Sequence, residues 1–108
     1  MAKPESEPAV PWLRSPICVE LGGRRWRLRS ARNLKAYNGE PAIGLCDDPS
    51  QIGKQIKIEA SLGDQELLEV LIHEMLHAQY WQLEEFAVDR AGREMATVLW
   101  RLGYRRTE

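Results

Sequence analysis

The sequence predicts an α+β fold in which a small, mostly antiparallel sheet of about four strands precedes two helices. Apolar and polar residues alternate on both sides of Gly22-Gly23, a pattern typical of a β-hairpin. From about residue 64 the apolar residues recur every three or four positions, which is the period of a helix. Both patterns lie within 108 residues, a length that favours a single domain.

The expected strands occupy the first half of the chain. The hairpin covers residues 17–21 and 24–29, and the remaining strands are a short apolar run at 42–46 and an alternating segment at 55–59. If the 55–59 strand lies at an edge of the sheet, it could pair with an extended peptide. Residues 1–15 contain Pro4, Pro8 and Pro11 and are expected to be a flexible segment, which leaves residues 16–108 as the domain.

Two helices are expected in the second half. Residues 64–80 are apolar around most of the helical circumference, so this helix should be largely buried. Residues 83–102 carry an apolar stripe at helical spacing, formed by Val88, Ala91, Met95, Val98 and Leu102. Because no glycine or proline lies between residues 78 and 83, these signals also allow one continuous helix.

Composition and charge indicate where in the cell the protein is expected. The formal net charge is −1, and no apolar run approaches the ~20 residues of a membrane-spanning helix. Acids and prolines stand where a secretory signal would need an apolar run. Cys18 and Cys46 are too few for a disulfide framework. We therefore expect a cytoplasmic protein with no membrane partner.

The only two histidines of the chain fall in one short motif, His73-Glu74-Met75-Leu76-His77. Histidines four residues apart on a helix share a face and can bind one zinc ion. Glu74 lies beside that face, where its carboxylate can take a proton from a zinc-activated water. The motif therefore predicts a Zn²⁺ site with His73 and His77 as ligands and Glu74 as the general base of a hydrolase.

A catalytic zinc usually has a third protein ligand, and here it must be a residue other than histidine. Glu84 extends the apolar stripe by one turn and is the preferred candidate, because a metal would compensate a carboxylate facing the core. Glu85 is the alternative, and Asp89 could orient a histidine ligand through a hydrogen bond. Either glutamate can reach the ion only if the chain folds back between about residues 79 and 83, since an unbroken helix would place Glu84 ~10 Å beyond His77.

Residues 54–104 resemble small HExxH metallopeptidase-like proteins of phage and prophage type, related to the ImmA/IrrE group. The strand at 55–58, the segment 71–78 and the pattern Glu84, Ala87, Ala91 carry the resemblance. It implies a minimal zincin-like fold, zinc, hydrolysis of peptide bonds in a peptide or protein substrate, and Glu84 as the third ligand.

Two other functions remain open. The segment from Arg24 to Lys35 is rich in arginine and could bind nucleic acid, with Trp26 stacking on a base, although a core position for Trp26 is the simpler interpretation. Alternatively, zinc could stabilise an interaction module that has no catalytic turnover. The sequence does not identify the substrate or the oligomeric state.

Overall fold

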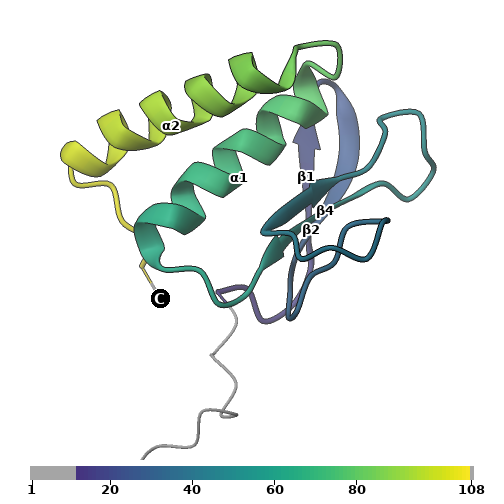
Figure 1. Ribbon diagram of the computed structural model, residues 1–108, viewed down its shortest axis with the longest axis horizontal. Coiled ribbons are helices and arrows are strands. Elements are labelled where there is room, and N and C mark those ends of the chain that lie inside the picture. The colour runs from purple at the N-terminus through teal and green to yellow at the C-terminus, as the bar shows by residue number, and fades with distance from the viewer. Residues whose placement is uncertain (1–11, 108) are drawn as a thin grey trace, which may run out of the picture.

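The computed structural model describes residues 12–107 and contains four strands followed by two helices (Figure 1). The strands are β1 (Ile17–Leu21), β2 (Arg24–Ala31), β3 (Gly44–Cys46) and β4 (Gln55–Glu59). The helices are α1 (Asp64–Gln79) and α2 (Glu85–Arg101). The predicted α+β class and order of elements are confirmed.

The β1–β2 hairpin forms because its turn residues suit the turn. Gly22 and Gly23 have φ angles of 61° and 73°, and a two-residue hairpin turn with both central φ angles positive matches the twist of the flanking strands. Leu21 then pairs with Arg24 and Ile17 with Leu28 in antiparallel register. This register places the alternate apolar residues of both strands on one face of the sheet.

The sheet is mixed, with strand order β1-β2-β4-β3. The outer pairs, β1–β2 and β3–β4, are antiparallel, whereas the central β2–β4 pair is parallel. The chain leaves β2, forms β3 at the far edge and returns as β4 into the gap between them. The strand at 55–59 is therefore interior, and β3 is the edge strand on that side. The suggestion that residues 55–59 pair with a peptide is thus wrong.

The core lies between the sheet and α1. Trp26, Ile56 and Ile58 are almost completely buried and pack with Val70 of α1 in one apolar cluster. The indole of Trp26 is 1% exposed, and its Nε1 donates a hydrogen bond to the carbonyl oxygen of Leu21 at 3.2 Å. The idea that Trp26 stacks on a nucleic-acid base is therefore wrong, and its interpretation as a core residue is confirmed.

The chain reverses direction between the helices, and α2 returns along α1 (Figure 1). Among the described helices and strands, α2 packs against α1 alone, whereas α1 also contacts the sheet. The expected apolar stripe of α2 is confirmed at Val88, which is fully buried. It is wrong at Met95, Val98 and Leu102, which are 48%, 57% and 69% exposed. The buried face consists of Val88, Gly92 and Ala96. Small side chains on that face let the two helices approach closely, and the expected stripe contained neither Gly92 nor Ala96.

The start of the described chain lies against the domain. Trp12 and Leu13 pack on the edge of the core, and the Ser30 hydroxyl donates a hydrogen bond to the carbonyl oxygen of Leu13 at 2.9 Å. Residues 1–11 of the predicted flexible segment lie outside the described residues. Among the described helices, neither is long and apolar enough to cross a membrane.

Glu59, at the end of β4, forms hydrogen bonds to the loops that contain Leu34 and Ser61. Its carboxylate accepts hydrogen bonds from the backbone N–H of Leu34 at 2.9 Å, and from the backbone N–H and hydroxyl of Ser61 at 3.2 and 3.1 Å. Partial burial raises the pKa of this carboxyl group, but the hydrogen bonds outweigh burial and leave the pKa below its ordinary value.

Candidate metal centre

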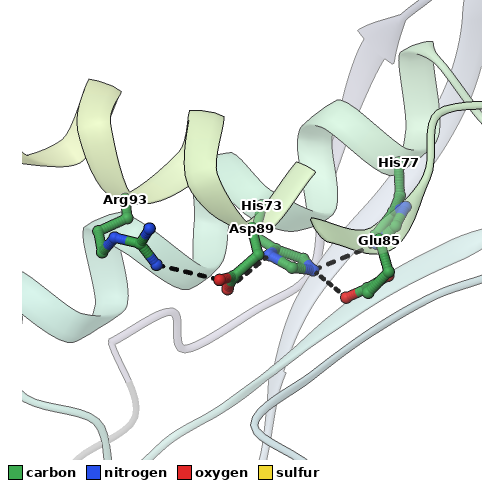
Figure 2. A network of polar contacts seen from close by, with 5 residues as sticks. All are labelled: His73, His77, Glu85, Asp89 and Arg93. Carbon is green, nitrogen blue, oxygen red and sulfur yellow. Dashed lines mark hydrogen bonds and ion pairs between the residues drawn. The ribbon is translucent and has the colours of Figure 1, made fainter. Parts of the chain in front are cut away.

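His73, His77 and Glu85 converge where α1 ends and α2 begins (Figure 2). The histidines lie one turn apart on α1, and Glu85 is the first residue of α2. Nε2 of His73 lies 2.9 Å from Oε1 of Glu85, and Nε2 of His77 lies 2.9 Å from Oε2. The two Nε2 atoms are 3.2 Å apart. One potential donor atom from each residue thus lies within 4.8 Å of the others, so the group could hold a metal ion.

These separations suit a small ion. Tetrahedral zinc with bonds of ~2.0–2.1 Å places its ligand atoms about 3.3 Å apart, close to the observed 2.9–3.2 Å. Two imidazoles and one carboxylate are also a donor set that zinc prefers. The two Nε2 atoms are also close enough to bind one ion, to which each imidazole would present an unprotonated nitrogen.

The structure brings Glu85, the alternative candidate, to the histidines, and not the preferred Glu84. Glu84 is the N-cap residue of α2, with an extended backbone (φ −68°, ψ 148°) and an exposed side chain. The preference for Glu84 came from extending the stripe of Val88, Met95 and Val98. Because the buried face runs instead through Val88 and Gly92, the residue one turn before it that faces α1 is Glu85.

Two local features place Glu85 at the histidines. α1 ends at Gln79 and α2 begins at Glu85, so the chain folds back over residues 80–84, as the metal hypothesis requires. One face of α2 then lies close to α1. A Cβ atom added at Gly92 would lie 3.4 Å from the backbone N and Cα of His73. Position 92 therefore has room for little more than a methyl group, and a small residue there lets the helices pack closely at His73.

Asp89 lies beside His73, on the side away from the cluster (Figure 2). Its Oδ1 is 4.0 Å from Nδ1 of His73, while Oδ2 accepts a hydrogen bond from Arg93 at 3.0 Å. A carboxylate facing the second nitrogen of a ligand histidine fixes the ring orientation and tautomer. The separation is longer than a hydrogen bond, so Asp89 lies next to His73 without the predicted hydrogen bond, and its orienting role stays a prediction.

Glu74 is the one charged residue among the described buried side chains and is 7% exposed. It lines a cleft of about 510 Å³ together with His73, His77 and Glu85. Burial, followed by the negative charge of Glu85, raises the pKa of Glu74 to about 7. Its carboxylate therefore shares a partly desolvated space with the three potential ligands.

The other wall of this cleft comes from residues that the sequence did not indicate. Gly44, Leu45 and Cys46 of the edge strand line it, as do Trp81 and Leu83 from the turn between the helices. Gly44 touches Glu74 closely, since a Cβ atom there would lie 2.6 Å from Oε2 of Glu74. The short apolar run at 42–46 indicated a strand, but only the sheet order could show that it borders the histidines.

Cys46 faces this cleft as a neutral thiol. Burial raises its pKa to about 12, and the negative charges of Glu74 and Asp47 add to the effect. Its Sγ is not among the donor atoms that converge with those of His73, His77 and Glu85.

Comparisons with protein-family models, curated proteins and solved structures found no match to this chain. The resemblance to HExxH metallopeptidase-like proteins therefore remains a prediction.

Proposed function

We propose that the protein is a zinc-dependent metallopeptidase, with His73, His77 and Glu85 as zinc ligands and Glu74 as the general base. The observation that carries the proposal is the convergence of the three donor residues in the cleft that Glu74 also lines. A metal-binding module without catalysis needs the three converging ligands. It does not need a buried carboxylate beside them. Burial of an unpaired carboxylate costs folding free energy, and a catalytic role gives a reason for the chain to keep it.

Each residue of the candidate site has a specific role in this proposal. Zinc, when bound, acts as a Lewis acid and lowers the pKa of water. Glu74 accepts a proton from the attacking water and later delivers it to the nitrogen of the leaving amine. Asp89 holds the ring of His73 so that its Nε2 faces the ion.

The free edge of strand β3 supports the proposal that the substrate is a peptide. The N–H of Glu59 bonds to the carbonyl of Ile43, and the N–H of Asp47 bonds to the carbonyl of Gln55. In an antiparallel pair this alternation turns the peptide groups of Gly44 and Cys46 away from β4, toward the free edge. Both residues line the cleft. An extended peptide that paired with this edge would pass in front of Glu74.

The test compares purified wild type, Glu74→Gln and Glu66→Gln for zinc content and for cleavage of unfolded casein and a mixed peptide library. Glu66 is an exposed acid on the same helix and serves as the matched control. We expect one zinc per chain in all three proteins, and cleavage by wild type and Glu66→Gln alone. Zinc without cleavage by wild type would contradict the peptidase proposal and favour an interaction module, and absence of zinc would contradict both.

A further inference from the structure

We infer that the protein has a second site, an arginine cleft beside β2, which binds the phosphate backbone of a nucleic acid. The cleft has a volume of about 340 Å³ and lies between the N-terminal segment and β2. Arg14, Arg27, Arg29 and Arg32 line it, together with Gln55 of β4. This site does not depend on the proposed peptidase function.

The alternation of β2 sets the position of the cleft. Trp26 and Leu28 point into the core beneath α1, so Arg27 and Arg29 point to the opposite face. Both helices lie on the α1 side of the sheet (Figure 1). No residue lines both this cleft and the cleft at the histidines, so a ligand here would leave the candidate metal centre accessible.

Two contacts hold the arginines around the cleft. The hydrogen bond from Ser30 to the carbonyl of Leu13 fixes the N-terminal segment along β2 and brings Arg14 to the rim. Nη1 of Arg29 donates to Oε1 of Gln55 at 3.3 Å, which orients that guanidinium across the neighbouring strand. The cleft is thus lined by cations whose backbone positions are set by the fold.

The charge of this region favours an anionic ligand. Residues 12–35 contain seven arginine and lysine side chains but only one acid, Glu20. No acidic side chain is among the described residues that line the cleft. Guanidinium groups bind phosphate through two parallel hydrogen bonds, and clustered arginines are typical of phosphate recognition.

The linear arrangement favours a nucleic-acid chain over a single phosphate. Arg25, Arg27 and Arg29 alternate along one face of β2, so successive side chains stand about 6.7 Å apart. Arg27 and Arg29 of this row line the cleft and can contact successive phosphates of one strand, whereas Arg25 lies outside the cleft and opposite Glu20. Because Trp26 is buried, binding should rely on the backbone and depend little on sequence.

The experiment measures binding of labelled, mixed-sequence single-stranded DNA, single-stranded RNA and duplex DNA by fluorescence anisotropy over a salt titration. The test variant is Arg27→Ala/Arg29→Ala. The control, Arg90→Ala/Arg101→Ala, removes the same charge from exposed positions on α2. If each arginine contacts one phosphate of a single strand, the test variant should lose about 25-fold in affinity at ~0.1 M salt, and its salt slope should fall by about 1.4. The control should lose less than about threefold.

Several results would overturn the inference. These are no binding of any oligonucleotide at low salt, an equal loss in the control, or binding only of inorganic phosphate, polyglutamate or anionic vesicles. Circular dichroism checks that each variant is folded. If the double variant fails to fold, Arg14→Ala replaces it, because Arg14 lies outside the strands. Its expected loss is about fivefold, and an unchanged affinity would count against the cleft.

Discussion

Replacing Gly44 by alanine should disturb Glu74 without touching the three potential zinc ligands. A Cβ atom at this position would lie 2.6 Å from Oε2 and 3.0 Å from Cγ of Glu74, and 2.8 Å from Cγ1 of Val70. Ordinary contacts of this kind begin at 3.4 Å. Val70 is 5% exposed and packed in the core, so the carboxylate of Glu74 is the group with most freedom to move.

The size of the effect follows from these distances. The Glu74 oxygen must shift by roughly 0.8 Å, and a displacement of about 1 Å in a catalytic group can lower activity by about 100-fold. Overpacking of this kind in a filled core costs about 1–3 kcal/mol of folding free energy. Zinc content should not change, because none of the three nearest atoms to the added Cβ belongs to a proposed ligand.

The assay combines urea unfolding, zinc analysis and peptide cleavage for wild type, Gly44→Ala and Gly63→Ala. Gly63 is the control because a Cβ atom there meets nothing within 4 Å. Its replacement at the N-cap of α1 should cost less than about 1 kcal/mol. A Gly44→Ala protein that unfolds at the same urea concentration as wild type and cleaves peptides at the same rate would refute the proposed contact.

Other parts of the structure make separate predictions. Stability due to the lowered pKa of Glu59 is fully present above its unfolded-state value of about 4.5 and disappears as the pH falls through the folded-state value; urea unfolding at several pH values should show a smaller acid-induced loss for Glu59→Gln. Trp26→Ala should lower the free energy of unfolding by about 3–5 kcal/mol, whereas Trp81→Ala, at a position that is 40% exposed, should cost much less; equal losses in urea unfolding would contradict the described core. Asp89→Ala should weaken zinc binding by about 10–100-fold in a competition titration with a chelating dye. An unchanged zinc affinity would show that Asp89 does not orient His73. Gly92→Leu should force the helices apart and reduce both zinc content and thermal stability, and a variant that keeps both would contradict the close helix approach.

Local patterns in the sequence predict most of the elements. The hairpin follows from alternation around Gly22-Gly23, because two glycines can adopt the positive φ angles that its turn requires. α1 follows from its apolar residues at helical spacing. The parallel pairing of β2 with β4 could not be predicted in this way, since it depends on where β3 leaves and re-enters the sheet. The edge position of β3, and with it one wall of the cleft, depends on that same long-range choice.

In the candidate site, too, some features follow from local sequence patterns and others depend on long-range packing. His73, Glu74 and His77 are recognisable because four-residue spacing on a helix has a direct geometric consequence. The choice between Glu84 and Glu85 depends on which face of α2 meets α1. Gly92 and Ala96 decide that face by allowing close contact, whereas the larger Met95 and Val98 remain exposed. A stripe that includes Met95 and Val98 instead of Gly92 and Ala96 rotates the helix by about one residue, which is enough to favour Glu84 over Glu85, the glutamate that lies beside the histidines.

The most direct test of the central claim is the zinc affinity of Glu85→Ala compared with Glu84→Ala at neutral pH, measured by titration against a chelating dye. The two variants remove the same charge from adjacent exposed positions, so their difference reports coordination rather than general electrostatics. We expect one tightly bound zinc per chain in wild type and Glu84→Ala, and a loss of at least about 10-fold in affinity for Glu85→Ala. Equal affinity in the two variants, or wild-type protein that binds no zinc, would contradict the proposed centre of His73, His77 and Glu85.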